Sequence, residues 1–178
     1  MSDLINVSNI SISFTQYIKG LNQRELKVIT DLTLDIKEGE IVAVLGSSGS
    51  GKSLLAHAIL GILPHNANLS GNMVYKGNVL TEELKKELRG HEIALIPQSV
   101  NFLDPLMKVS DQVIGECADE AEEKEKRAKQ RAIFEKYGLS EEVDDMYPFQ
   151  LSGGMARRVL VSTALLSNPK LVIADEPT

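Results

Sequence analysis

The sequence has few of the features that mark secreted, membrane-spanning or nucleic-acid-binding proteins. Its single cysteine, Cys117, cannot form an internal disulfide, which fits a reducing compartment. No apolar run approaches the roughly 18 residues that cross a bilayer, and the start, "MSDLINVSNI", has no basic segment before an apolar one, so no signal peptide is predicted. The net charge of -6 and the pI of about 5.1 argue against nucleic acid, which needs a basic face. We expect a cytoplasmic protein.

Length and hydrophobic patterning predict an α/β protein. The 178 residues, 43% of them apolar, suffice for one domain with a packed core. Alternating apolar residues within the first 40 positions predict half-buried, antiparallel strands. Three short continuous apolar runs predict strands of a parallel sheet that is covered on both faces. The alternating residues are Ile10, Ile12 and Phe14, then Leu32, Leu34 and Ile36, and the runs are "IVAVL" (41–45), "IALI" (93–96) and "LVIA" (171–174).

Two segments have the pattern of helices. "KSLLAHAILGIL" predicts a helix that Pro64 ends. In "DEAEEKEKRAKQR" (119–131), four glutamates each precede a Lys or Arg by four residues, which predicts a solvated helix, and Gly138 is a suitable C-cap. We therefore predict an α/β core with a mostly helical insertion from about 99 to 165.

The segment "GSSGSGKS" matches the phosphate-binding pattern G-x-x-x-x-G-K-[ST]. Its glycines let backbone N–H groups turn toward a phosphate, and the positive N-terminus of the following helix points at the same anion. Lys52 can reach the β- and γ-phosphates, and the Ser53 hydroxyl can bind Mg²⁺. The predicted phosphate-binding residues are Gly46, Ser47, Ser48, Gly49, Ser50, Gly51, Lys52 and Ser53.

Two adjacent carboxylates follow the last apolar run. In a phosphate-loop protein, Asp175 would hold Mg²⁺ directly or through water, and Glu176 would polarise an attacking water. The structural alternative is that Asp175 caps a turn or a helix.

A third motif, "LSGGM" (Leu151–Met155), opens a predicted helix. Ser152 is a good N-cap, and Gly153 and Gly154 permit close approach of a phosphate. The order of the motifs is phosphate loop, "LIPQ" with Gln98, "LSGGM" and "LVIADE". Over almost its whole length the chain resembles the ATP-binding cassette (ABC) ATPases.

The resemblance implies roles for further residues. Gln98 would contact Mg²⁺ and sense a transmembrane partner, and with Glu176 and Lys52 it completes the expected catalytic set. Phe14 would stack on adenine; Tyr17 competes for this role, and plain core packing is the alternative for either ring. Leu54, which belongs to the nucleotide-binding set, replaces the family's commoner threonine.

The resemblance also implies an organisation and partners. A P-loop core with a mostly parallel sheet and an antiparallel β part would take residues 1–98 and 166–178, and a helical subdomain with the signature would take 99–165. Two ATPase subunits would dimerise head to tail, so that Ser152, Gly153 and Gly154 of one close over ATP and Mg²⁺ in the other. Permease subunits would hold the pair at the inner face of the cell membrane, with an extracytoplasmic substrate-binding protein as an indirect partner.

Finer features are similar to the peptide and nickel importers. Met155 stands where many members have glutamine, and "LGILP", "LDP" and "YPFQLSGGM" fit that branch. The leading hypothesis is an ATPase subunit that energises import of peptides or nickel complexes. A chromosome or DNA-repair ATPase is disfavoured, because the span between phosphate loop and signature leaves no room for a long coiled coil.

The alternative hypothesis is a truncated nucleotide-binding fragment without significant hydrolysis. The family has an aspartate loop directly after "EPT" and a switch histidine later, whereas the three histidines here all precede Asp175. On this view the last part of the core is missing, ATP binding survives and turnover is very low. The histidines are His57, His65 and His91.

Overall fold

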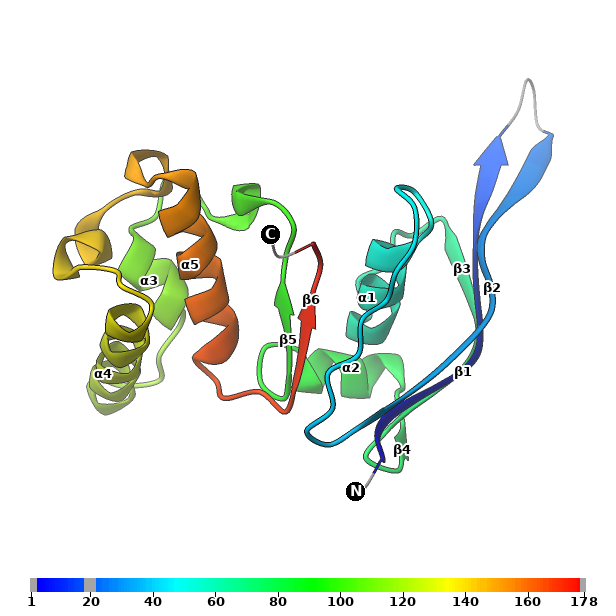
Figure 1. The fold of residues 1–178 in the computed structure, drawn as a ribbon, viewed down its shortest axis with the longest axis horizontal. Helices are drawn as coiled ribbons and strands as arrows, with labels where there is room; N and C mark the ends of the chain where they lie inside the picture. The colour runs from blue at the N-terminus through cyan, green and yellow to red at the C-terminus, as the bar shows by residue number, and fades with distance from the viewer. Residues whose placement is uncertain (1–2, 18–21, 177–178) are drawn as a thin grey trace. The chain divides into compact units, whose positions relative to one another are not determined.

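The computed structural model describes residues 3–17 and 22–176, which form two compact units, Met1–Arg89 and Gly90–Thr178. We call them the N-terminal and C-terminal units (Figure 1). The elements of the N-terminal unit are β1 (Asp3–Tyr17), β2 (Gln23–Lys37), α1 (Lys52–Leu60), β3 (Ala67–Tyr75), β4 (Asn78–Val79) and α2 (Glu82–Leu88). Those of the C-terminal unit are β5 (Ile93–Ile96), η1 (Val100–Phe102), α3 (Val109–Ile114), α4 (Glu120–Lys136), η2 (Glu141–Asp145), η3 (Pro148–Gln150), α5 (Gly153–Leu165) and β6 (Leu171–Ala174).

The N-terminal unit contains the predicted antiparallel sheet, with strand order β2-β1-β3-β4. Ile10 and Ile12 are buried and Phe14 is half-buried, so the period-two prediction for β1 is confirmed. On β2, half-buried residues alternate with exposed ones, as expected for a strand that covers a core on one side. The half-buried residues are Leu32, Leu34 and Ile36.

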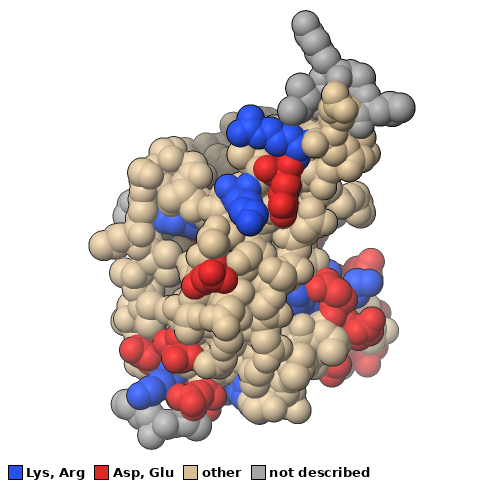
Figure 2. Space-filling view, turned by 90° about the vertical axis from the view of Figure 1, so that its right-hand side faces the viewer, with Lys and Arg blue, Asp and Glu red and all other residues tan. Residues whose placement is uncertain are grey.

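The surface of the molecule carries charges of both signs. On the face that Figure 2 shows, lysines and arginines lie beside aspartates and glutamates in small groups, with uncharged surface between them. The described residues on this face therefore form no continuous basic surface.

Two of the three predicted parallel strands form. β5 and β6 pair in parallel, from Ile93 opposite Leu171 to Ile96 opposite Ala174. The sequence predicts that both faces of these strands are buried. This prediction is confirmed for β5 but is wrong for β6, because the Val172 side chain is 39% exposed.

The prediction of a strand at 41–45 is wrong. This run belongs to neither sheet of the described residues, and Ile41 is 98% and Leu45 90% exposed. A strand needs a neighbour to satisfy its N–H and C=O groups. Because no described strand pairs with it, the run's apolar composition does not produce a strand.

Helix α1 ends earlier than the sequence analysis predicted. Gly61, with φ +66°, caps it, and the N–H of Ile62 donates to the carbonyl of His57 at 2.9 Å. A glycine in the left-handed conformation is a common helix stop. Pro64 therefore lies beyond the helix and does not end it.

Residues 99–165, all of which the structure describes, contain helices and turns and no strand, as predicted. Their core is built around Val109, Phe134 and Val159, whose side chains are fully buried. Gly138, with φ +68°, follows the cap of α4 directly. Three of the four predicted ion pairs on α4 form: Glu122–Lys126, Glu123–Arg127 and Glu125–Lys129. None of the helices in the described part of the chain has both the length and the apolar character needed to cross a membrane.

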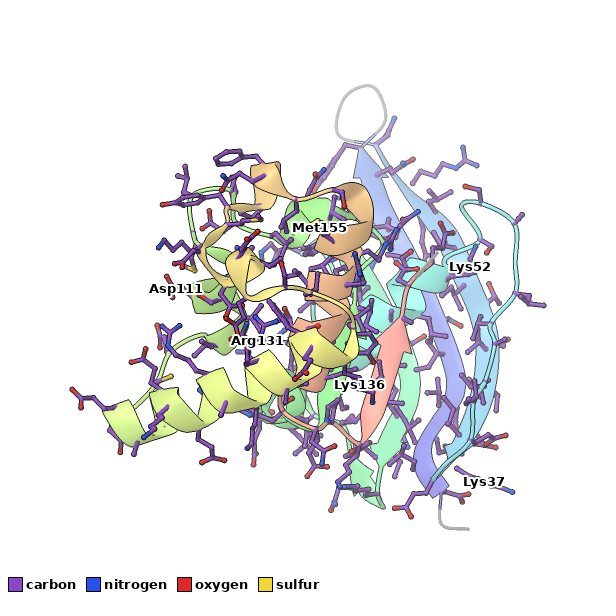
Figure 3. The ribbon with its side chains drawn as sticks, turned by 60° about the vertical axis from the view of Figure 1, so that its left-hand side comes forward. Lys37, Lys52, Asp111, Arg131, Lys136 and Met155 are labelled. Carbon is purple, nitrogen blue, oxygen red and sulfur yellow. The ribbon has the colours of Figure 1, made fainter. Side chains whose placement is uncertain are left out.

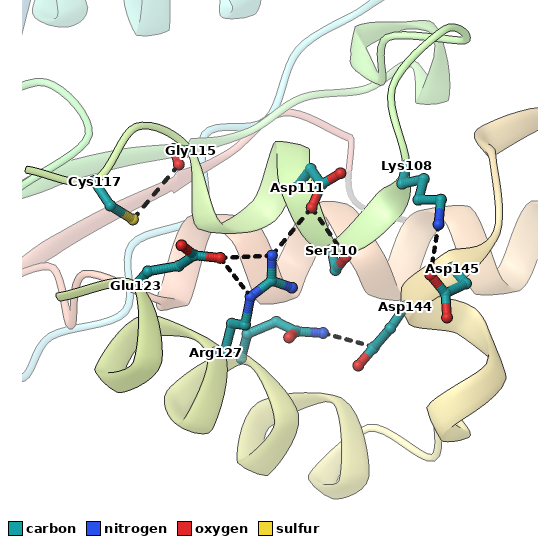
Figure 4. A network of polar contacts seen from close by, with 10 residues as sticks. Lys108, Ser110, Asp111, Gly115, Cys117, Glu123, Arg127, Asp144 and Asp145 are labelled. Carbon is teal, nitrogen blue, oxygen red and sulfur yellow. Dashed lines mark hydrogen bonds and ion pairs between the residues drawn. The ribbon is translucent and has the colours of Figure 1, made fainter. Parts of the chain in front are cut away.

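Polar contacts tie α4 to the segment that follows it (Figure 4). The Asp144 carboxylate accepts hydrogen bonds from Gln130 Nε2 at 2.8 Å and Arg131 Nη1 at 2.7 Å. Gln130 is only 1% exposed, so Asp144 satisfies an amide that water cannot reach.

The neighbouring Asp145 is exposed and accepts a hydrogen bond from Lys108 Nζ at 2.7 Å. This bond holds the pKa of Asp145 below its ordinary value. The pair therefore stabilises the folded chain above the ordinary pKa of aspartate, and the stabilisation is lost as the pH falls through the lowered value.

We expect Asp144→Ala to lower the free energy of unfolding by about 2 kcal/mol, because it leaves the buried Gln130 amide without an acceptor. Urea denaturation followed by circular dichroism measures this. The matched control is Asp145→Ala, whose effect should be clearly smaller and should disappear as the pH falls through the lowered pKa of Asp145. Equal effects of the two substitutions would contradict the role given to Asp144.

Candidate functional site

The phosphate loop, Gly46–Ser53, leads directly into α1. Its first five residues are exposed, and Gly51, Lys52 and Ser53 are half-buried. Lys52 stands in the first turn of α1 (Figure 3), and its Nζ donates to the carbonyls of Gly46 at 3.0 Å and Ser47 at 3.1 Å. The ammonium group therefore closes the loop into a ring and places a positive charge on it.

Two glycines of the loop adopt the left-handed conformation, but only one of them is also crowded by a neighbouring side chain. Gly51 (φ +93°) is the N-cap of α1, and a Cβ there would lie 2.9 Å from Cγ1 of Ile29 on β2. Gly49 (φ +79°) has open space around it. Only glycine fits at 51, because both the backbone and the available space exclude a side chain.

The two candidate adenine-stacking rings lie on β1. Phe14 is half-buried and pairs with Leu26 and Ala67 in the neighbouring strands. Tyr17, at the end of the strand, is 71% exposed. Tyr17 thus has the more accessible ring, while Phe14 is partly covered by the sheet.

In the C-terminal unit, the parallel pairing of β5 and β6 brings Gln98 to Glu176. Both residues follow the carboxyl ends of their strands, which lie at one edge of the sheet. The Asp175 N–H donates to the Ile96 carbonyl at 3.0 Å, and Gln98 Nε2 donates to Glu176 Oε2 at 2.5 Å. Two carboxylates and an amide therefore gather at this edge.

The signature segment begins α5 as the sequence predicts. The Ser152 hydroxyl accepts from the Met155 N–H at 3.3 Å, which confirms Ser152 as the N-cap. Gly153 and Gly154 are exposed, with no atom within 4 Å of the position of an added Cβ. The two glycines that begin α5 thus present bare backbone, and Met155 follows them in the same turn (Figure 3).

One contact of the site was not predicted from the sequence. Arg157 Nη1, one turn into α5, donates to the backbone carbonyl of Glu176 at 3.2 Å. The adjacent Arg158 instead donates to the carbonyls of Tyr137, Gly138 and Gly154. The doubled arginine after the signature is the only sequence signal, and it does not show which of the two reaches Glu176.

The predicted site residues divide between the units. The N-terminal unit holds Phe14 and the loop residues Gly46, Ser47, Ser48, Gly49, Ser50, Gly51, Lys52, Ser53 and Leu54, and the C-terminal unit holds Gln98, Ser152, Gly153, Gly154, Asp175 and Glu176. Within the units the structure joins Lys52 to the start of its loop and Gln98 to Glu176.

A phosphate loop before a helix, together with carboxylates at the end of a parallel strand, defines a P-loop nucleotide-binding protein. Residues 29–178 match the family model described as ABC transporter. The chain therefore belongs to the ABC transporter family.

Two curated relatives are similar to this chain in sequence. A Staphylococcus epidermidis protein with the provisional name hemin import ATP-binding protein HrtA is 38% identical over 97% of this chain and 74% of its own. The oligopeptide transport ATP-binding protein AppD of Bacillus subtilis is 33% identical over 100% of this chain and 56% of its own. This chain therefore spans between about half and three quarters of the length of these relatives.

One similar solved structure is MJ0796, described as a bacterial ABC transporter cassette and determined as a dimer. It matches with a TM-score of 0.78 and 26% identity over 98% of this chain and 75% of its own. MJ0796 has also been solved in a post-hydrolysis state bound to ADP and Pi, with a TM-score of 0.77 and 25% identity over 98% of this chain. The predicted fold class is thereby confirmed.

We expect Gly51→Ala to lower the free energy of unfolding by about 1–3 kcal/mol, since the new methyl group meets Ile29 and the backbone is held at positive φ. Gly49→Ala is the matched control and should lower it by about 1 kcal/mol through its backbone alone. Thermal and urea unfolding measure both. A cost for Gly49→Ala equal to that for Gly51→Ala would show that the contact with Ile29 is unimportant.

Proposed function

We propose that this chain is the ATP-binding and ATP-hydrolysing subunit of a membrane importer. The observation that carries the proposal is the contact between Gln98 and Glu176 at the carboxyl edge of β5 and β6, in a chain that also holds a complete phosphate loop. Membership of the ABC transporter family supports it.

In this proposal the loop from Gly46 to Ser53 binds the phosphates of ATP through its backbone N–H groups and the charge of Lys52. Lys52 would move from the Gly46 and Ser47 carbonyls to the β- and γ-phosphate oxygens. Adenine would stack on Phe14 or, as the competing candidate, on Tyr17.

The residues proposed for Mg²⁺ have the oxygen donors that this ion prefers. They are the Ser53 hydroxyl, the Asp175 carboxylate and the amide oxygen of Gln98. The Gln98 amide nitrogen already donates to Glu176, so its oxygen is the atom that would turn toward a cation. Bound Mg²⁺ neutralises charge on the phosphate oxygens during phosphoryl transfer.

Glu176 is the proposed general base. Its carboxylate would accept a hydrogen bond from the attacking water and take up a proton from it. The hydrogen bond from Gln98 fixes the position of one carboxylate oxygen of Glu176.

The proposed partners follow from the exposed signature glycines. Ser152, Gly153 and Gly154 would close over the nucleotide of a second ATPase subunit, and the dimeric state of MJ0796 supports such an arrangement. Permease subunits would anchor the pair at the cytoplasmic face of the membrane, and an extracytoplasmic substrate-binding protein would act indirectly.

Peptides are the proposed cargo class, because the likeness to AppD extends over the whole of this chain. The relatives named above are called after oligopeptides and hemin, and neither is called after nickel. The alternative, a nucleotide-binding fragment without significant hydrolysis, gains no support from the comparisons.

We expect Lys52→Ala to weaken ATP binding by about 10- to 100-fold, the loss that follows from removing charge-assisted hydrogen bonds to phosphate. Isothermal titration calorimetry with a non-hydrolysable ATP analogue measures the affinity. Lys170→Ala, which removes a charge at an exposed position of the C-terminal unit, should leave the affinity within a factor of two. Unchanged affinity in Lys52→Ala would remove the phosphate-loop assignment.

We expect Glu176→Gln to retain nucleotide binding and to reduce kcat at least 100-fold, in line with the contribution of a positioned general base. Steady-state phosphate release at saturating ATP measures the turnover. Hydrolysis at the wild-type rate in this variant would contradict the role of Glu176.

A further inference from the structure

Two of the residues that contact Glu176 come from different elements. Gln98, after β5, donates to its side chain at 2.5 Å, and Arg157, on α5, donates to its backbone carbonyl at 3.2 Å. The side chain and the backbone of Glu176 therefore accept hydrogen bonds from different residues.

The backbone of Glu176 requires such support. Its φ is +44°, in the left-handed region that residues other than glycine rarely occupy. A residue in this region stays there only where the surrounding contacts fix it. The hydrogen bond from Arg157 to the carbonyl of the same residue is one of these contacts.

Arg157 shares a rigid element with the signature glycines. It lies three residues after Gly154 on α5, and the helix is capped by Ser152 and anchored by Val159 and Leu160, which are buried. Because an α-helix moves as a unit over such a distance, a shift of its first turn also moves the Arg157 guanidinium. The Glu176 peptide then follows through the hydrogen bond.

We propose that Arg157 is a positioning residue that links the signature helix to the proposed general base of its own chain. Contact of Ser152–Gly154 with a neighbour's nucleotide sets the position of α5, and Arg157 transmits that position to the Glu176 peptide. The carboxylate is then aligned for attack only when the signature of the same chain is engaged. This inference rests on the proposed function.

The first test compares Arg157→Gln with wild type in steady-state ATP hydrolysis. We expect kcat to fall by about 10-fold while KM for ATP and the affinity for a non-hydrolysable analogue stay within a factor of two, because Arg157 is bonded to the backbone of the proposed general base, Glu176. Arg157→Lys keeps a cationic donor and should recover most of the lost kcat. The control Lys170→Gln removes one positive charge directly before β6, at the end of the strand away from Glu176, and its kcat and KM should match those of wild type.

The second test is a double-mutant cycle with Glu176→Gln. If Arg157 acts through Glu176, Arg157→Gln causes no further loss of kcat once Glu176→Gln is present. A further 10-fold loss in the double variant, or a rise of KM that accounts for the whole defect, would overturn the inference. If Arg157→Gln fails to fold, Arg157→Met, which keeps the apolar stem, takes its place in both tests.

The outcomes separate the two proposals. Wild-type turnover that Glu176→Gln abolishes and Arg157→Gln leaves unchanged overturns the positioning role alone. A wild type without turnover, or turnover that is insensitive to Glu176→Gln, overturns the proposed function and the positioning role with it.

Discussion

The parallel pairing of β5 with β6 is the constraint on which the chemistry of the C-terminal unit depends. Parallel strands end at the same edge of their sheet, so two segments more than seventy residues apart deliver Gln98 and Glu176 to one place. The bond from the Asp175 N–H to the Ile96 carbonyl continues this pairing beyond the last strand residue. A slip of one residue in this register would turn the carboxylates to the opposite face of the sheet.

Helix α5 packs against β5, where Ala164 shares a buried cluster with Ala94 and Ile96. Phe134 and Val159 pack in one core, and Asp144 fixes the chain where it leaves α4. Through that packing α5 has a defined position, and Gly153 and Gly154 at its start expose backbone without side chains. Helix α5 therefore packs in the core and also begins with the signature residues.

Local signals in the sequence predicted much of this arrangement. The phosphate loop, the Ser152 cap and the two short strands β5 and β6 depend on residues close together in the chain, so a pattern of spacing suffices to find them. The ion pairs of α4 are of the same kind, since residues four apart on a helix are neighbours.

Features that depend on distant partners were missed. An apolar run such as 41–45 becomes a strand only where another strand lies beside it. The sequence of the run itself does not show whether such a neighbour exists. The Arg157 contact spans nineteen residues and two elements, so no spacing rule indicates it. Because proline ends helices generally, Pro64 is the expected stop of α1, but Gly61 ends the helix first by its backbone conformation.

The contact between Gly51 and Ile29 has a consequence for how this sequence can change. The space that a side chain at 51 would need is already occupied by the Ile29 methylene carbon, so side chains at both positions cannot fit there together. Ile29 belongs to the sheet by its pairing with Ile12, yet its bulk sets the limit on residue 51 in the phosphate loop. A smaller residue at 29 would open space beside Gly51, but the positive φ at 51 would still favour glycine, so the loop is protected twice against a side chain at this position.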